Sequence, residues 1–287
     1  MVIKAENLSF IYGSGTPFEH KALDNINLTI ESGEIIGVIG HTGSGKSTLI
    51  QHFNGLLKPT SGKITIDGVD IRESKEKLHK VRFDVGLVFQ YPEYQLFEET
   101  VFKDIAFGPR NMGLSEEEIT KRVLKACEFV GIREELLNKS PFELSGGQKR
   151  RVAIAGVIAM EPKVLILDEP AAGLDPKGRN KILNQIKAYH EATKSTVLLV
   201  SHSMEDVANY AEKVLVMNDS KVFLYDETEK VFARSDELKK IRLSVPQVTN
   251  VFKKLSENGL LIADNVYTVN YAKEKILNAL KKEDLNA

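Results

Sequence analysis

This chain of 287 residues lacks several features that would point to particular classes of protein. It has one cysteine, Cys127, which excludes an internal disulfide and favours a reducing compartment. Its net charge is −1, with 39 Lys and Arg against 40 Asp and Glu, so no basic excess attracts nucleic acid. No apolar run approaches the roughly 18 residues that span a bilayer, and the first residues lack the layout of a signal peptide. We therefore expect a globular protein with no nucleic-acid partner, which reaches a membrane only through other subunits.

A glycine-rich stretch lies between an apolar run at 35–39, typical of a buried parallel strand, and a helical segment that continues over 49–53. The stretch consists of Gly40, His41, Thr42, Gly43, Ser44, Gly45, Lys46, Ser47 and Thr48. It fits the phosphate-loop pattern G-x-x-x-x-G-K-[ST], in the strand–turn–helix context that the pattern needs. Backbone amides and the helix N-terminus would hold anionic oxygens, Lys46 would reach the β- and γ-phosphates, and Ser47 would ligate Mg²⁺. The sequence thus predicts a nucleoside triphosphate site.

Two acids, Asp168 and Glu169, directly follow a second apolar run at 164–167. If this strand ends beside the phosphate loop, Asp168 would reach Mg²⁺ and Glu169 would lie next to the γ-phosphate. Glu169 is then the candidate general base for an attacking water. Paired acids often end a strand by chance, so the phosphate loop is what favours the catalytic interpretation.

The order of the expected elements predicts an α/β fold with a helical insertion. Residues 2–10 and 22–30 alternate apolar and polar side chains, as half-buried antiparallel strands do. Further strands are expected at 63–67, 85–89, 164–167 and 196–200, with a pair near 213–225 and a helix at 177–192. Residues 91–160 should form a helical subdomain, because strand–helix alternation resumes on its far side.

Within that subdomain, Ser115 and Glu118 are expected to form a capping box. One face of the helix that follows should be buried: Ile119, Val123, Ala126, Cys127 and Val130. We expect a main domain over 1–232 and a small C-terminal domain over 233–287. Two apolar stripes support the latter: Val248, Val251, Phe252 and Leu255, then Ile276, Leu277 and Leu280.

The run Leu144-Ser145-Gly146-Gly147-Gln148 resembles the signature of the ATP-binding cassette (ABC) ATPases. The resemblance implies a P-loop cassette: a mixed sheet core, an antiparallel β subdomain and an inserted helical subdomain. It also implies that Ser145, Gly146, Gly147 and Gln148 contact ATP bound to a second subunit, in a head-to-tail dimer with two ATP molecules between the subunits. The basic run 149–151 that follows is expected to be a solvated helix face.

Other positions resemble the family in the same order along the chain. Gln90 would sense Mg²⁺ and water, and Asp175 would lie in a loop that crosses the dimer interface. His202 would contact the γ-phosphate, and Tyr12 would stack on adenine unless it packs in the core. Ala171 departs from the family, which often has threonine there, but a small residue still fits. The resemblance covers residues 1 to about 230.

Residues 89–101 and 104–109 are similar to the energy-coupling factor (ECF) importers of prokaryotes. Residues 143–153, 172–176 and 245–249 agree with this resemblance. It implies ATP and Mg²⁺ as cofactors, and hydrolysis that drives uptake of a vitamin or a transition-metal ion. The implied partners are a second ATPase, a membrane scaffold subunit and a substrate-capture membrane subunit, with this chain peripheral at the cytoplasmic face of the cell membrane. The chain looks like the second of two non-identical ATPases, although cobalt and nickel importers use one ATPase twice.

The alternatives are other classes that share the phosphate loop. A chromosome or DNA-repair ABC ATPase would insert a long coiled coil between loop and signature, but residues 47–144 contain no heptad run. A translation factor would carry two cassettes, and a small-molecule kinase has no use for the signature. The ATPase of an ABC exporter remains the main alternative. The sequence does not reveal the transported substrate.

An aromatic and apolar stretch after Gln90 predicts a partner site. Tyr91, Tyr94, Leu96 and Phe97 are interrupted by Pro92 and flanked by three acids, Glu93, Glu98 and Glu99. Such a rimmed patch suits a groove in which a membrane-protein helix lies, with a basic residue near the glutamates. The alternative is that Leu96 and Phe97 fill the core of the helical subdomain.

Overall fold

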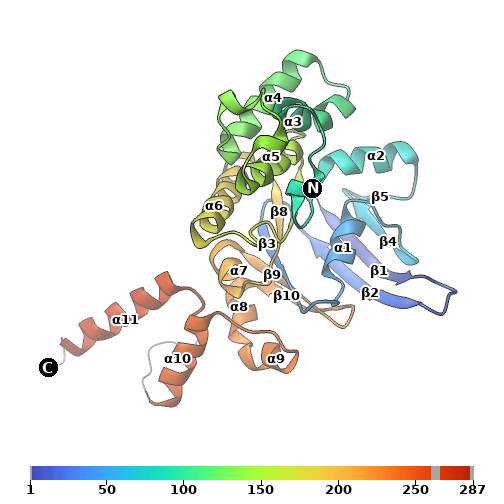
Figure 1. Ribbon diagram of the computed structural model, residues 1–287. Coiled ribbons are helices and arrows are strands. Elements are labelled where there is room, and N and C mark those ends of the chain that lie inside the picture. The colour runs from blue at the N-terminus through green and yellow to red at the C-terminus, as the bar shows by residue number, and fades with distance from the viewer. Residues whose placement is uncertain (1, 260–265, 285–287) are drawn as a thin grey trace.

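The computed structural model describes residues 2–259 and 266–284, with side chains of the last helix described as far as residue 278. A six-stranded sheet lies at its centre (Figure 1), in the order β10-β9-β3-β8-β7-β6. Its strands are β3 (Ile35–Ile39), β6 (Val85–Val88), β7 (Val164–Asp168), β8 (Thr196–Val200), β9 (Lys213–Asn218) and β10 (Lys221–Glu227). All are parallel except β10. Every residue of β3, β7 and β8 is buried, which explains their continuous apolar runs.

A second, antiparallel sheet has the order β2-β1-β4-β5. Its strands are β1 (Ile3–Tyr12), β2 (His20–Ile30), β4 (Ser61–Ile66) and β5 (Val69–Asp70). Leu8 and Leu23 of this sheet share a core with Leu49 and Phe53 of α1 (Lys46–Phe53) and with Val200 of β8. This sheet therefore covers the helix that begins at the phosphate loop.

Helix α2 (Lys75–Asp84) was not expected from the sequence. Only Val81 is buried along it, so the helix has almost no apolar stripe to detect. Its local signal is the cap, because the Ser74 hydroxyl accepts a hydrogen bond from Lys77 N at 3.1 Å.

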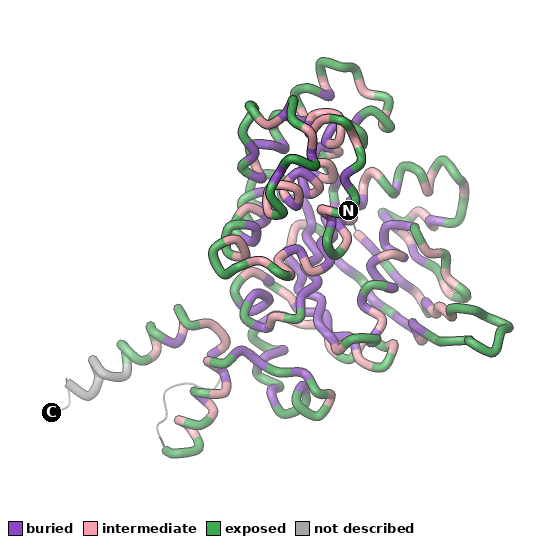
Figure 2. The backbone as a smooth tube through the Cα atoms, viewed as in Figure 1, coloured by how far each residue is buried: buried purple, intermediate pink, exposed green. Residues whose placement is uncertain are grey.

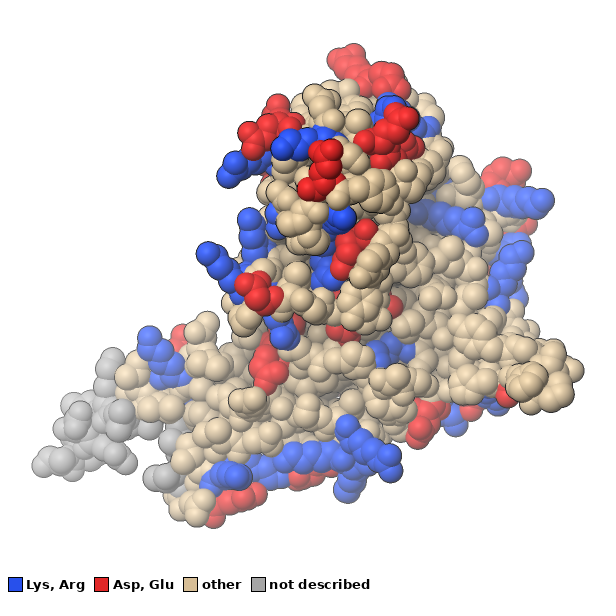
Figure 3. All heavy atoms as spheres, in the orientation of Figure 1, with Lys and Arg blue, Asp and Glu red and all other residues tan. Residues whose placement is uncertain are grey.

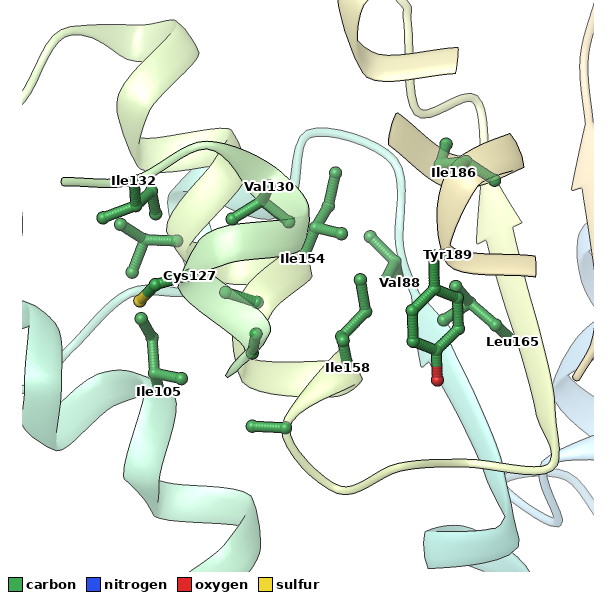
Figure 4. Close-up of a cluster of buried hydrophobic side chains, with 14 of the residues drawn as sticks. Val88, Ile105, Cys127, Val130, Ile132, Ile154, Ile158, Leu165, Ile186 and Tyr189 are labelled. Carbon is green, nitrogen blue, oxygen red and sulfur yellow. The ribbon is translucent and has the colours of Figure 1, made fainter. Parts of the chain in front are cut away.

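The helical insertion stands at one end of the central sheet (Figure 1). Its elements are η1 (Pro92–Gln95), α3 (Val101–Asn111), α4 (Glu116–Val130), η2 (Glu134–Leu136), η3 (Pro141–Glu143) and α5 (Gly146–Ile158). The expected apolar face of α4 is buried throughout. Figure 4 shows how Cys127 and Val130 of α4 lie near Ile154 and Ile158 of α5 and Leu165 of β7, in one core that joins the insertion to the sheet.

The capping box expected at the start of α4 is half formed. Ser115 Oγ accepts a hydrogen bond from Glu118 N at 3.3 Å. The Glu118 carboxylate accepts instead from Arg122 Nε at 2.8 Å, one turn further along the helix. The expectation was therefore wrong for the Glu118 side chain, which finds a charged partner in place of the backbone.

The remaining helices are α6 (Pro176–Thr193), α7 (Met204–Tyr210), α8 (Thr228–Ala233), α9 (Ser235–Lys240), α10 (Gln247–Glu257) and α11 (Val269–Asp284). Leu238, Leu243 and Val245 pack in one cluster with Val214 and Val216 of β9, so the segment after α8 begins on the main body. Helix α11 extends away from that body (Figure 1), and most of its residues from 269 to 278 are exposed (Figure 2).

The first C-terminal stripe is divided between packing and exposure. Phe252 is buried against Val266 and Ala272, whereas Val251 is 54% exposed. Ile276 and Leu277 of the second stripe are exposed, and the side chain of Leu280 lies outside the described residues.

On the face drawn in Figure 3, Lys and Arg are interspersed with Asp and Glu. No helix in the described part of the chain is long and apolar enough to cross a membrane.

Candidate functional site

Four segments that carry predicted site residues converge at one edge of the central sheet. Parallel strands present their carboxyl ends at the same edge, which is where α/β proteins bind ligands. The phosphate loop follows β3, Gln90 follows β6, Asp168 ends β7, and His202 follows β8. A cavity of about 250 Å³ lies there, lined by Tyr12, His20, Ala22, Thr42, Gly43, Gly45, Lys46, Ser47, Thr48, Gln90, Asp168, Glu169 and His202.

The phosphate loop has the backbone that its glycines predict. Gly45 has φ +100°, in the left-handed region, and a Cβ there would lie 2.5 Å from Ala22 O. A Cβ at Gly43, with φ +82°, would meet no atom within 4 Å, so this glycine borders open space. The Lys46 ammonium donates to Gly40 O at 2.6 Å and to His41 O at 3.1 Å. The loop thus holds a buried cation at the cavity, as a phosphate site requires.

Three residues predicted to bind ATP do not line the cavity, although they lie in the same loop. The Ser44 hydroxyl is buried, and a Cβ at Gly40 would clash with the Met217 carbonyl. His41 Nε2 lies 3.1 Å from Oδ1 of Asn218, the last residue of β9. The side chains of Ser44 and His41, and the absence of a side chain at Gly40, therefore help to set the conformation of the loop.

Ser47 and Asp168 form an oxygen pair that fits Mg²⁺. Ser47 Oγ donates to Asp168 Oδ2 at 3.1 Å, and Gln90 lines the same cavity. Oxygen ligands of this kind suit Mg²⁺, which keeps several waters and commonly takes phosphate oxygens as further ligands. In the described residues, no group of three or more His, Cys, Asp and Glu could hold a metal.

Both acids at this edge of the sheet have a raised pKa. Burial, and then the neighbouring Asp168 charge, raise the pKa of Glu169 to about 7, against the effect of Lys46. Burial raises the pKa of Asp168 as well, and the same cause lowers the pKa of Lys46. Glu169 has φ +52°, a strained conformation of the kind found at functional sites. A carboxyl that titrates near neutral pH is matched to general base catalysis.

The Glu169 side chain faces His202. Glu169 Oε1 is buried and has no hydrogen-bond partner in the described residues, and it lies 3.7 Å from His202 Nε2. Burial, followed by the Lys46 charge, lowers the pKa of His202. An unpaired buried acceptor is costly, so this oxygen is positioned for a donor that enters the cavity.

Tyr12 lies at the mouth of the cavity. Its ring is 41% exposed and makes an edge contact with Phe10, and its hydroxyl lies 3.3 Å from Thr48 Oγ1. His20 is paired with Tyr12 across β1 and β2, and it lines the cavity with Ala22. The sequence analysis missed His20 and Ala22. The hairpin register, which places His20 opposite Tyr12, is the signal that could have found them.

The signature residues and Asp175 are not brought to this cavity. Ser145 Oγ accepts from Gln148 N at 3.4 Å, and Gln148 Oε1 accepts from Ser145 N at 2.9 Å, which forms a complete capping box on α5. Asp175 caps α6 by accepting from Gly178 N at 2.9 Å. Ser145, Gly146 and Asp175 are exposed. Within one chain, Ser145, Gln148 and Asp175 cap helices, and Ser145, Gly146 and Asp175 remain accessible to solvent.

The basic run at 149–151 is not a solvated face, so that expectation was wrong. Arg150 is 3% exposed, and its guanidinium donates to Glu93 Oε1 at 2.6 Å and to Glu93 Oε2 at 3.0 Å. Burial opposes ionisation of Glu93, but the hydrogen bonds from Arg150 hold the pKa of its carboxyl below the usual value. Burial lowers the pKa of Arg151. The buried partner explains the error, because a contact 57 positions away leaves no local pattern.

The family model described as ABC transporter matches residues 23–172. The chain is 62% identical to the energy-coupling factor transporter ATP-binding protein EcfA2 of Clostridium acetobutylicum, over 98% of this chain and 99% of that protein. It is 60% identical to the EcfA2 protein of Caldanaerobacter subterraneus, over 98% of each.

Solved structures agree with these relatives. The structure of cbiO1 from Clostridium perfringens, part of the ABC transporter complex cbiONQ, matches with a TM-score of 0.74 and 43% identity, over 88% of this chain and 98% of that one. A dimeric ATP-binding cassette bound to ADP and Pi matches with a TM-score of 0.71 and 31% identity, over 79% of this chain and 98% of that one.

The fold and site thus define an ABC-type ATPase. Within that class, the chain belongs to the ATP-binding proteins of energy-coupling factor transporters, which confirms the resemblance noted from the sequence.

The raised pKa of Glu169 predicts an acid limb in the activity profile. If Glu169 is the general base it acts only when deprotonated, so kcat/KM for MgATP should be half its full value near pH 7, approach that value by about pH 8, and fall by about tenfold per unit well below pH 7. Steady-state hydrolysis between pH 5.5 and 8.5 measures this limb, with nucleotide binding measured in parallel. A profile that stays flat from pH 8 down to 6 would contradict the assignment of Glu169.

Proposed function

We propose that this chain binds MgATP in the cavity at the end of the central sheet and that Glu169 activates the water that attacks the γ-phosphate. The supporting observation is the buried Glu169 Oε1, which has no hydrogen-bond partner in the described residues and lies 3.7 Å from His202 Nε2, in a carboxyl with a pKa of about 7. In this proposal Lys46 neutralises phosphate charge, while Ser47, Asp168 and Gln90 hold Mg²⁺. Tyr12 stacks on the base, and the backbone of residues 40–48 encloses the phosphates.

Replacement of Glu169 by glutamine should separate binding from hydrolysis. Glu169→Gln keeps the size of the side chain but removes its basicity, so MgATP should bind while turnover falls by about a hundredfold. Lys46→Ala should instead lose nucleotide binding, because the buried charge opposite the phosphates is gone. Nucleotide titration and phosphate release distinguish the two.

Glu191→Gln is the matched control, since the Glu191 side chain is 61% exposed and does not line the cavity. It should hydrolyse ATP at the unmodified rate. Near-normal turnover of Glu169→Gln would refute the proposed base.

We also propose that the signature completes the site of a second ATPase subunit. A Cβ at Gly146 would meet no atom of this chain within 4 Å, and its φ is not in the left-handed region. Neither crowding nor backbone strain within the chain requires glycine there, which is the expected condition if another molecule approaches closely. Ser145, Gly147, Gln148 and Asp175 would lie on the same interface. In this proposal the working form is a heterodimer of two related ATPases.

If the active unit is this dimer, Ser145→Arg should leave MgATP binding to the dilute chain unchanged but lower hydrolysis by at least about tenfold, because the arginine obstructs close approach of the subunits. Hydrolysis by the unmodified chain, alone or mixed with the second ATPase, should rise faster than linearly with subunit concentration. Turnover that is linear in chain concentration and insensitive to Ser145→Arg would show that one chain suffices.

The chain would act as a peripheral subunit at the cytoplasmic face of the membrane, joined to a scaffold subunit and a substrate-capture subunit that import a vitamin or a transition-metal ion. We infer the docking surface from Tyr91, Tyr94, Phe97 and Phe107, which are 44%, 85%, 58% and 45% exposed. Phe97 and Phe107 make an edge contact at 5.0 Å, so the patch spans η1 and α3. Such exposed aromatic groups mark interaction sites.

Two parts of the earlier docking hypothesis need correction. Leu96 is 9% exposed and joins the hydrophobic core, so it does not line a groove. Glu93 is paired with buried Arg150, which leaves Glu98 and Glu99 as the acids beside the patch. Glu99 already pairs with Lys103 at 2.5 Å.

Introducing charge into the patch should disrupt assembly. Tyr94→Asp combined with Phe97→Asp should abolish co-purification with the membrane subunits while the chain still folds and binds ATP, because both rings are exposed. Phe18→Asp is the matched control, since Phe18 is 88% exposed in the turn between β1 and β2. An insoluble double variant would mean that these rings are core, and intact co-purification would place the docking surface elsewhere.

We treat residues 1–232 as the ATPase domain, with its helical subdomain over about 91–160, and residues 233–287 as a small C-terminal domain that adds a nucleotide-independent contact between ATPases. The exposed Val251, Ile276 and Leu277 support that contact. Buried Phe252 serves the internal packing of the segment.

A further inference from the structure

Three segments of the ATPase meet at one side chain, Arg150. It belongs to α5, whose first residues form the signature. Its guanidinium contacts η1, the segment that follows Gln90, and also the loop that follows Glu169. No other function described above accounts for this residue.

The contact with η1 is a bidentate ion pair between buried Arg150 and partly buried Glu93. Arg150 Nη2 and Nε donate to the two oxygens of Glu93 at 2.6 and 3.0 Å. The Arg150 side chain is 4% exposed and that of Glu93 is 15% exposed. The planar fork of arginine fits a carboxylate in one orientation, so the pair fixes both the distance and the angle between α5 and η1.

The third nitrogen of the same guanidinium holds the loop after Glu169. Arg150 Nη1 donates to Ala172 O at 2.5 Å and to Pro170 O at 3.3 Å. Pro170 is the residue directly after the proposed general base, and the loop continues to Asp175 at the start of α6. Since one rigid group carries both sets of contacts, η1 and the loop cannot move apart without breaking hydrogen bonds to a buried charge.

Tyr91 adds a second contact between the same segments. Its ring lies over the Arg150 guanidinium, 6.0 Å from centroid to Cζ, and a Cβ at Gly173 would lie 4.0 Å from the Tyr91 ring. Tyr91 has φ +55°, which is unusual for an aromatic residue and is maintained only where the surroundings determine it. Tyr91, the strained residue between Gln90 and η1, is therefore packed against the Arg150 guanidinium.

We propose that Arg150 is a positioning residue that makes η1 and the loop after Glu169 move as one body, so that the state of the docking segment sets the placement of the general base. Arg150 does not line the nucleotide cavity, and it acts through Glu93 on one side and through Pro170 and Ala172 on the other. The regulatory meaning of this link rests on the function proposed above, because only a membrane partner on η1 would use it. The mechanical link between η1 and the loop does not depend on that proposed function.

The decisive experiment changes one segment and measures the other. Glu93→Gln alters η1 but leaves the loop untouched, and Arg150→Lys keeps the charge but cannot hold both sets of partners. Amide hydrogen exchange of the nucleotide-free chain should quicken at least tenfold in residues 169–175 of both variants. Two amides there report directly, since Ala172 N donates to Glu169 O at 3.1 Å and Leu174 N donates to Ala171 O at 3.3 Å.

Arg122→Lys is the matched control. Arg122 is also an arginine paired with glutamate within the helical subdomain, with a side chain 17% exposed, but it contacts neither η1 nor the loop. It should leave exchange at 169–175 unchanged. Unchanged exchange there in Glu93→Gln and Arg150→Lys overturns the proposal, and so does acceleration that is equally strong across α4, which would mean general loss of stability.

Kinetics supply a second readout. The Glu93 side chain does not line the nucleotide cavity, so Glu93→Gln should lower kcat severalfold while the MgATP dissociation constant stays within twofold. In the complex with its membrane subunits, any stimulation of hydrolysis by those subunits should be lost. If the unmodified chain binds no membrane subunit at all, the proposed transport function fails, whereas the exchange measurement on the chain alone still decides the role of Arg150.

Discussion

Asp168, which ends β7 and is buried, and Glu169, which follows it and is largely buried, share the neighbourhood of Lys46, and the properties of the site follow from this imbalance of charge. A buried carboxylate without a full set of partners is unstable as an ion, so Glu169 retains its proton up to about pH 7. Asp168 shares the burial but is hydrogen-bonded by Ser47, which favours its ionised form. Burial is the larger cause of the raised pKa of Glu169, and the Asp168 charge is the smaller one.

The central sheet and the nucleotide cavity could be predicted from the sequence because their signals are local. Continuous apolar runs identify buried parallel strands, and residues at their carboxyl ends must meet at one edge, as Gln90, Asp168 and His202 do. The phosphate loop could be predicted for the same reason, because the backbone conformation that requires its glycines is set by residues close in sequence. The buried face of α4 followed from helical periodicity alone.

The features that could not be predicted from the sequence depend on contacts between segments that are far apart along the chain. Arg150 stands in a run of three basic residues, and only the folded chain brings Glu93 and two backbone carbonyls to it. Helix α2 buries a single residue and so has no stripe, and His20 reaches the cavity only through strand pairing. The signature residues are the limiting case, because their proposed ligand belongs to a different molecule.

The single cysteine gives the chain a practical property. Cys127 is 2% exposed in the core between α4 and its neighbours, and burial raises the pKa of its thiol to about 12. At neutral pH only roughly one molecule in a hundred thousand would carry the reactive thiolate, compared with a few per cent for a free cysteine. We therefore expect Cys127 to react very slowly with thiol reagents. A cysteine introduced on an exposed surface could carry a spectroscopic label without first removing the native one, so distances within a working transporter could be followed in the otherwise unaltered chain.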